Sequence, residues 1–381
     1  MNLGYIKLLP TGMARGSLSR FHKAFLTGDY PTFLLLEVTE RCNCRCTMCR
    51  IWAKKNPGEP SLSDYERLFC DPLWHSLRIL SLTGGEPFLR NDLKDLLILA
   101  SQLIPRLERI SLPSNGLLSE RIEETTRGVI SSLPKHISFK IGISLDGQEK
   151  IHDTLRGVPG AFSKAVETIK RLKSIKEPNF SVGILSLITP ENAPYLENAH
   201  SFYTSLTDQV TYTLLTQAEF FGNLEKNNFR FSPEATEYIQ RFIEKTLIPE
   251  CPEKAYLYSR YCNHLVKNRR TYPCLAGYLS AYVDVKGNLL PCHYVGEDFT
   301  FANFLTCETT LEKEWFSPRA RTIRRGLRRH GYCLNCSNNC DFRNLVMEDF
   351  WNFFGYLVSH PGIPASALFH NKNSGKGERD V

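Results

Sequence analysis

The stretch LLLEVTERCNCRCTMCRIW, residues 34–52, runs from an apolar segment directly into four closely spaced cysteines. Unbroken Leu and Val at its start are typical of a parallel strand that is buried on both faces. Cys42, Cys44, Cys46 and Cys49 follow within eight residues, which is too crowded for disulfides. The stretch therefore predicts a first strand followed by a loop that holds metal or iron–sulfur chemistry.

The spacing of Cys42, Cys46 and Cys49 places three thiolates on one short loop, and thiolates suit iron–sulfur clusters or zinc. A cubane cluster takes four ligands, so three cysteines leave one iron open to a ligand that is not protein. A zinc knuckle would use Cys44 as a fourth ligand. Residues 42, 44 and 46 alternate along the chain and converge poorly on one ion, which favours the cluster and leaves Cys44 as a spare thiol.

Five further apolar runs follow the first one, and amphipathic segments lie between them. The expected strands, rich in Val, Ile and Leu, are residues 32–38, 77–82, 109–114, 138–145, 180–188 and 209–216. The segments with helical periodicity are residues 61–69, 91–103, 160–176 and 191–206. We expect Ser63, with Glu66, to cap the first of these helices and Asn91 or Asp92 the second. Such alternation indicates a parallel sheet, either open or closed into a partial barrel, with its functional edge where the strands end.

The pattern changes after residue 217. Residues 232–248 and 254–270 are expected to be helical, and YVDVKGNLLPC at 282–292 has a hairpin signal with its turn at Lys286, Gly287 and Asn288. Five cysteines surround this hairpin: Cys274, Cys292, Cys333, Cys336 and Cys340. They predict a second metal-binding unit.

The C-x3-C-x2-C spacing after a first strand resembles the signature of the radical SAM superfamily, and TGGEP at 83–87 resembles that family's GGEP motif. The resemblance implies an α/β fold, a partial (β/α)6 TIM-like barrel followed by a small cysteine-rich hairpin-plus-helix domain. It also implies a 4Fe-4S cluster on Cys42, Cys46 and Cys49 whose open iron binds S-adenosylmethionine (SAM). Reductive cleavage of SAM would give a 5′-deoxyadenosyl radical that abstracts a substrate hydrogen.

By the same resemblance, a set of residues at the strand ends is expected to contact SAM. Glu86 would accept from the amino group, and Arg156 would meet the carboxylate. Met48 stands where the family usually has an aromatic residue near adenine. The expected SAM-binding residues are Met48, Gly84, Gly85, Glu86, Pro87, Ser114, Asn115, Ser144, Asp146 and Arg156. Ordinary turn chemistry is the alternative for the Asn-Gly and Asp-Gly pairs.

The second cysteine set resembles the twitch or SPASM extension of radical SAM enzymes, which holds auxiliary 4Fe-4S clusters. A full SPASM domain uses about seven cysteines, so one auxiliary cluster is expected. Its ligands by analogy are Cys274, Cys292, Cys333 and Cys336, with Cys340 as the rival for the last place; a zinc ribbon is the alternative. The expected parts of the chain are an N-terminal extension at 1–31, the barrel core at 32–216, a helical linker at 217–273, the auxiliary-cluster domain at 274–352 and a tail at 353–381.

A basic helical segment lies between the last cysteine sets. Five arginines recur at helical spacing and would form one face, either solvated or able to dock phosphate, carboxylate or an acidic peptide: Arg321, Arg324, Arg325, Arg328 and Arg329. The net charge of +7 only weakly favours an anionic partner. No nucleic-acid-binding module is visible.

The sequence leaves the substrate open among a peptide, a protein side chain, a sugar and another small molecule. About thirty residues precede the first strand, which weighs slightly against leader-dependent peptide maturation. Hydrophobic residues make up 42% of the chain, enough for a large core, and no run is long enough to span a membrane. Without a signal peptide, the expected location is the cytoplasm, with flavodoxin or ferredoxin as electron donor. A non-enzymatic zinc-binding interaction module is the contrasting hypothesis.

Overall fold

The computed structural model describes residues 29–54, 58–218, 220–223, 231–250, 254–267, 269–270, 274, 276–327, 333 and 336. Within these residues the strands form one sheet in the order β6-β5-β4-β3-β2-β1-β7-β8-β9. The first six are parallel: β1 (Phe33–Thr39), β2 (Ile79–Gly84), β3 (Arg109–Ser114), β4 (Ser138–Ser144), β5 (Phe180–Ile188) and β6 (Val210–Leu214). Each agrees with an expected strand to within two residues.

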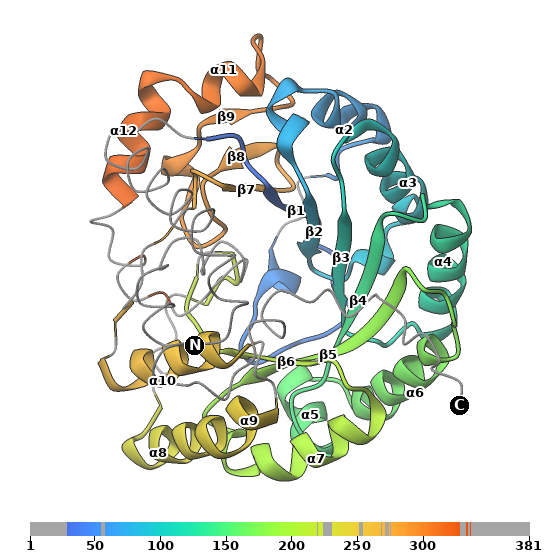
Figure 1. Cartoon of the computed structure of the whole chain (residues 1–381), viewed down its shortest axis with the longest axis vertical. Helices are drawn as coiled ribbons and strands as arrows, with labels where there is room; N and C mark the ends of the chain where they lie inside the picture. The colour runs from blue at the N-terminus through green and yellow to red at the C-terminus, as the bar shows by residue number, and fades with distance from the viewer. Residues whose placement is uncertain are drawn as a thin grey trace, which may run out of the picture.

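Helices cover the outer face of these six strands and give the curved, barrel-like arrangement of Figure 1. Leu34, Leu36 and Val38 of β1 belong to the main core, together with Tyr65 and Phe69 of the first helix. The helices of this part are α2 (Leu62–Phe69), α3 (Leu93–Leu103), α4 (Ser119–Ser132), α5 (Glu149–Arg156), α6 (Ala161–Lys173) and α7 (Leu196–Leu206). The predicted partial α/β barrel is confirmed.

Two helices, α4 and α5, were not among those expected from periodicity. In α4 the N-cap position is Leu118, which makes no side-chain capping bond, and the helix contains Thr125, Thr126 and Gly128, all weak helix formers. Packing against α6 therefore stabilises α4 more than the helix propensity of its own residues does.

The predicted cap of α2 was wrong. Ser61, not Ser63, is the N-cap: its hydroxyl accepts from the Asp64 backbone N–H, and the Asp64 carboxylate accepts from the Ser61 N–H. Asp92 does occupy the N-cap of α3, but its carboxylate pairs with Arg90 (2.7 Å) and makes no capping bond. A capping box can be shifted by two residues when serines stand at both positions.

The C-terminal hairpin continues the barrel sheet. β7 (Ser280–Val283) pairs parallel with β1, and β8 (Asn288–Leu290) pairs antiparallel with β7 and with β9 (Ala302–Asn303). The predicted turn lies between β7 and β8, where Gly287 has a positive φ of 90°. The remaining helices are α8 (Pro233–Phe242), α9 (Ile248–Glu250), α10 (Ala255–Lys267), α11 (Leu311–Trp315) and α12 (Pro318–Leu327). The hairpin thus lies beside the first strand (Figure 1).

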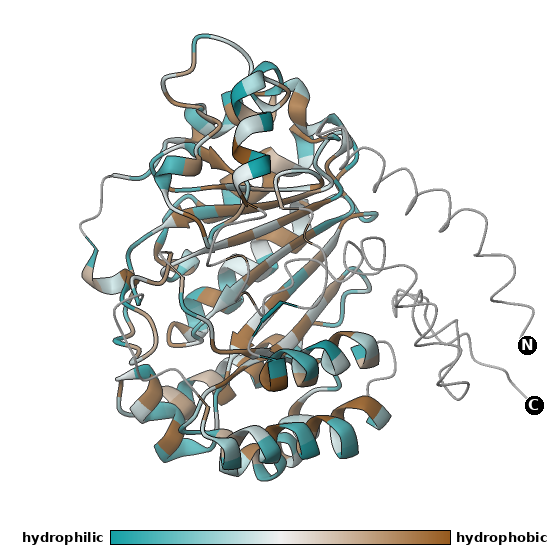
Figure 2. Cartoon of the chain, turned by 90° about the vertical axis from the view of Figure 1, so that its left-hand side faces the viewer, coloured by the Kyte–Doolittle hydropathy of each residue, from teal (hydrophilic) through white to brown (hydrophobic). Residues whose placement is uncertain are grey.

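Hydropathy follows the layers, since the strands carry much of the apolar colour in Figure 2 and the outer helices are banded. In the described parts of the chain we find no helix with the length and apolarity that a membrane crossing needs.

Candidate SAM and iron–sulfur site

The cysteine loop leaves the end of β1 and is tied to the end of α5. The backbone N–H groups of Arg45 and Thr47 donate to the carbonyls of Arg156 and Leu155, both at 2.9 Å. Gly157 ends α5 with φ +64°, and a Cβ there would meet the Arg45 carbonyl oxygen at 2.4 Å. The close contact between the two segments therefore depends on a glycine.

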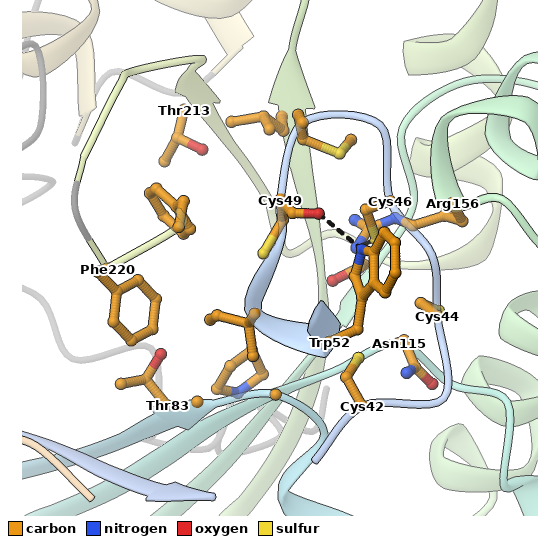
Figure 3. A pocket seen from close by; sticks show the side chains of 18 of the residues that line it. Cys42, Cys44, Cys46, Cys49, Trp52, Thr83, Asn115, Arg156, Thr213 and Phe220 are labelled. Carbon is orange, nitrogen blue, oxygen red and sulfur yellow. Dashed lines mark hydrogen bonds between the residues drawn. The ribbon is translucent and has the colours of Figure 1, made fainter. Parts of the chain in front are cut away.

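Cys42, Cys46 and Cys49 all line one cavity, on the side of it that Arg156 also borders (Figure 3). A hydrogen bond from the Cys44 thiol, with help from Arg156, lowers the pKa of Cys46 to about 6, and the same thiol lowers the pKa of Cys42. Donation to these two neighbours raises the pKa of Cys44 itself. Burial raises the pKa of Cys49 to about 12. Cys44 thus favours thiolates at Cys42 and Cys46 while staying protonated.

The GGEP loop lies directly against the chain that leads into Cys42. The Gly85 N–H donates to the Thr39 carbonyl at 2.7 Å, and the Glu86 N–H donates to the Arg41 carbonyl at 2.8 Å. Gly84 and Gly85 line the cavity, whereas Glu86 and Pro87 do not. The motif therefore presents backbone to the cavity.

The Glu86 carboxylate, which was expected to accept from the amino group of SAM, makes hydrogen bonds inside the protein. It is 1% exposed and accepts from the Asn115 N–H (2.7 Å), the Ser114 hydroxyl (3.0 Å) and the Phe88 N–H (3.2 Å). Burial nevertheless raises its pKa to about 7. Glu86 therefore joins the end of β2 to the end of β3 and leaves no described contact with the cavity.

Replacing Gly85 by alanine is expected to destabilise the protein by at least about 2 kcal/mol, since a Cβ there would lie 2.1 Å from the Arg41 carbonyl oxygen. The matched control is Gly128→Ala in α4, where the added methyl meets only the flexible Lys94 side chain, at 3.2 Å. That change should be neutral or stabilising by up to about 1 kcal/mol. Urea unfolding of both variants measures the difference; equal stabilities would contradict the tight contact.

Arg156 is held at the cavity by a buried acid. Its guanidinium pairs with Asp146 at 2.6 Å and lies 3.9 Å from the Cys46 sulfur. Burial opposes the charged form, but Asp146 and Cys46 raise the pKa of Arg156 overall. Asp146 is fully buried, does not line the cavity, and accepts from the Leu187 N–H at 2.8 Å. Asp146 therefore contacts Arg156 from the side that faces away from the cavity lining.

The Nε of Arg156 is buried and has no hydrogen-bond partner among the described residues. A buried guanidinium donor without a partner is costly unless a ligand accepts from it. Together with three thiols on one loop, this donor fits a cluster-bound molecule that carries a carboxylate, as SAM does.

Four other expected residues border the same cavity, namely Met48, Ser114, Asn115 and Ser144. Asn115 also donates to the Asn43 side chain at 2.6 Å, which links the third strand end to the cysteine loop. The sequence reasoning missed part of the wall: Trp52, Thr83, Thr213, Phe220, Phe221 and Tyr294. Apart from Thr83, which begins the TGGEP stretch, these residues belong to no motif, although the aromatic pair just after the sixth expected strand was a usable signal.

Cys274 and Cys292, two of the expected auxiliary ligands, are neighbours of Cys333. Burial raises the pKa of Cys333 to about 12, with contributions from the nearby Cys274 and Cys292. The sulfurs of Cys274 and Cys292 each accept from a backbone N–H at 3.4 Å. Cys336 packs with Tyr294 and Cys292. Cys340 lies outside the described residues.

The predicted basic docking face was wrong for Arg324. This side chain is 0% exposed, its Nε donates to the Gly277 carbonyl, and it lies over the rings of Trp315, Phe301 and Tyr278. Burial lowers its pKa to about 10. Arg321 is half-buried and Arg325 is exposed, while Arg328 and Arg329 lie outside the described residues. The spacing rule identified a shared face without showing that the centre of this face is packed on aromatic rings.

Comparison with family models gives two matches. The model described as the radical SAM superfamily matches residues 36–202, and the model described as SPASM, an iron–sulfur cluster-binding domain, matches residues 274–341. The chain belongs to the radical SAM superfamily. The cofactors of this radical SAM protein are therefore SAM, the 4Fe-4S cluster that binds it, and auxiliary iron–sulfur clusters in the SPASM segment.

Among curated proteins, the radical SAM chain is similar to the sporulation killing factor maturation protein SkfB of Bacillus subtilis, with 26% identity over 282 residues. That match covers 72% of this chain and 63% of SkfB. Matches to two further curated relatives cover 33% and 39% of their lengths.

Solved structures show the same fold. One is anSMEcpe with bound AdoMet, at a TM-score of 0.58 and 16% identity, covering 89% of this chain and all of that one. Another is Streptococcus suis SuiB bound to its precursor peptide SuiA, at a TM-score of 0.57 and 18% identity, covering 84% of this chain and 74% of SuiB.

The zinc alternative is not favoured. The model that matches the second cysteine set describes an iron–sulfur cluster-binding domain, and the model that matches residues 36–202 is that of the radical SAM superfamily.

Proposed function

We propose that this enzyme binds SAM at a 4Fe-4S cluster on Cys42, Cys46 and Cys49 and uses it to abstract a hydrogen atom from a peptide substrate. The observation that carries the proposal is the single cavity that joins these three cysteines to the backbone of Gly84 and Gly85 and to the unpartnered Nε of Arg156. When bound and reduced, the cluster and SAM supply the 5′-deoxyadenosyl radical that starts the reaction.

The protein's own groups would hold and shield SAM. Arg156 would donate to its carboxylate, with Asp146 as the buried acid that positions the guanidinium. Gly84 and Gly85 bring backbone carbonyls to the ligand without side chains, which suits an amino group. Ser114, Asn115 and Ser144 offer polar contacts at the strand ends, and Met48 can pack on a ring. Leu187, Leu214 and Leu215 add apolar lining to the cavity, which would help to exclude water.

A second 4Fe-4S cluster is proposed on Cys274, Cys292, Cys333 and Cys336. Proximity of the first three thiols and the backbone donors to two of their sulfurs support this choice. An electron acceptor at this place would allow a net two-electron oxidation of the substrate or a cross-link. We expect flavodoxin or ferredoxin as the reductant and the cytoplasm as the location.

The names of the similar proteins support a peptide as the class of substrate. SkfB is a maturation protein, anSMEcpe has been solved with bound peptides, and SuiB with a precursor peptide. These descriptions concern proteins at 26% identity or less, so the substrate class of this chain is a proposal.

Anaerobic reconstitution tests the proposal. The protein should bind about eight iron atoms, for two cubanes, and convert SAM to 5′-deoxyadenosine when a reductant is added. Iron analysis and chromatography of the nucleoside provide the measurement. A zinc-containing protein without iron would support the interaction module instead. An iron-replete protein that forms no 5′-deoxyadenosine would refute the proposed chemistry.

A further inference from the structure

A second cavity adjoins the one that holds the cysteines, and Phe220 lines both. Its polar lining comes from two parts of the chain. Glu37 and Glu40 come from β1 and the residues just after it, whereas Asp284, His293 and Glu297 come from the segment around β7 and β8. Neither the cluster ligands nor the residues proposed to hold SAM border this cavity.

Glu37 projects toward the inside of the barrel. It pairs across the sheet with Thr83, which lines the SAM cavity, while its neighbours Leu36 and Val38 point into the core under the helices. One carboxylate oxygen accepts from the Tyr282 hydroxyl at 2.7 Å and from the Val285 N–H at 3.3 Å. The other, Oε1, has no partner among the described residues, although the residue is only 2% exposed.

Glu40 repeats this arrangement at the same cavity. It is 6% exposed, and its Oε1 lies 3.4 Å from the Lys54 ammonium. Its Oε2 is buried and is likewise unpartnered within the described part of the chain. A buried carboxylate oxygen that accepts no hydrogen bond costs about 1–3 kcal/mol. Two such oxygens in one cavity indicate a donor that binds there.

The charges around the cavity favour a cation. Four carboxyl groups line it, those of Glu37, Glu40, Asp284 and Glu297, against the two lysines Lys54 and Lys286. Lys286 is already paired with Glu297 at 2.6 Å, and Lys54 is the lysine beside Glu40. Burial raises the pKa of Glu37 to about 7, against the lowering effects of the Tyr282 hydroxyl and the Lys54 ammonium, and the neighbouring Glu40 adds to the rise.

The ligand chemistry is that of an organic cation. The described residues offer no set of three side chains that could hold a metal ion here. An ammonium or guanidinium group carries several N–H donors, so one such group could donate to the carboxyl groups of both Glu37 and Glu40, which line the cavity. The aromatic ring of Phe220 beside it adds a surface that tolerates positive charge, as the Lys54 ammonium 5.7 Å from its centre already shows.

We infer that this cavity binds a lysine or arginine side chain of the peptide substrate, with Glu37 and Glu40 as its acceptors. The inference rests on the proposed peptide-modifying function and names the part of the peptide that it recognises. Because Phe220 separates the two cavities, a peptide anchored here extends directly toward the SAM cavity. The site is thus a specificity determinant for a residue near the one that reacts.

Binding can be measured without turnover. The reconstituted holoenzyme with SAM is titrated anaerobically, at low ionic strength, with N-acetyl-lysine methylamide, its arginine counterpart and the uncharged norleucine counterpart. Calorimetry should show the two cationic compounds binding about 10- to 100-fold more tightly than the norleucine compound, as expected for hydrogen bonds to charged groups. Glucosamine is the further probe, because an amino sugar has the same ammonium chemistry.

The variants Glu37→Gln and Glu40→Gln keep the side-chain shape and remove the charge, and each should lose most of the preference for the cationic compounds. Glu177→Gln is the matched control, since Glu177 is paired with Lys135 on the surface, and should retain the preference. Iron content and circular dichroism of each variant show that it is folded.

Several outcomes would overturn the inference. One is equal binding of the lysine and norleucine compounds to the wild type, as expected if water fills the cavity. Another is a preference that survives in both glutamine variants. A third is binding of glucosamine without the lysine compound. A wild type that forms 5′-deoxyadenosine but shows no cation preference refutes this inference alone, whereas cation binding without SAM cleavage refutes the proposed function.

Discussion

Cys46→Ala is expected to reduce 5′-deoxyadenosine formation below detection and to lower the iron content from about eight to about four atoms per chain. Cys46 lies at the centre of the ligand loop, 3.9 Å from Arg156, and has its pKa lowered to about 6 by Cys44 and Arg156. Loss of this thiolate removes one of three ligands from the cluster, and two cannot hold a cubane at one edge of an open cavity. Iron analysis and anaerobic SAM cleavage measure both effects.

The matched control is Cys70→Ala, at an exposed thiol just after α2, which should retain full iron and activity. The variant Cys44→Ala tests whether Cys44 is a cluster ligand or only a hydrogen-bond donor to the neighbouring thiolates. We expect it to retain four irons at this site, because Cys44 is the protonated neighbour of two thiolates. If Cys44→Ala lost the cluster while Cys46→Ala kept it, the assignment of ligand and bystander would be reversed.

Much of the fold could be predicted because its strands are long, apolar and buried. The runs at 109–114 and 180–188 coincide with β3 and β5, since buried Ile110 and Leu112 in the first, and Val182, Ile184 and Ile188 in the second, recur at the two-residue period of a strand. The parallel pairing of β7 with β1 could not be predicted. It is a contact between segments about 245 residues apart. The hairpin signal at 282–292 does not indicate which strand the hairpin pairs with.

The positions of site residues could be predicted where a sequence motif fixes the backbone. They could not be predicted where a side chain has several possible hydrogen-bond or packing partners. Cys42, Cys46 and Gly85 line the cavity. Glu86 does not, because its carboxylate satisfies donors at the end of β3. Arg324 shows the same limit: helical spacing groups arginines on a face, but only tertiary packing shows that one of them is enclosed by aromatic rings.

Arg156→Met is expected to lower the free energy of unfolding by about 3–5 kcal/mol and to weaken SAM binding by about 10- to 100-fold. The stability loss arises because Asp146, which is fully buried, would lose the guanidinium that pairs with it at 2.6 Å. The binding loss arises because the unpartnered Nε would no longer meet the SAM carboxylate. Urea unfolding and a SAM titration measure the two effects separately.

The double variant Asp146→Asn/Arg156→Met distinguishes the two roles. Neutralising the acid removes the unpaired buried charge, so much of the lost stability should return, while SAM binding should stay weak because the donor is still missing. Arg127→Met, which breaks an exposed pair with Glu123, should cost only about 0.3–0.5 kcal/mol. If the double variant recovered SAM binding together with stability, Arg156 would be a structural residue at this cavity, and the carboxylate of SAM would have to be held elsewhere.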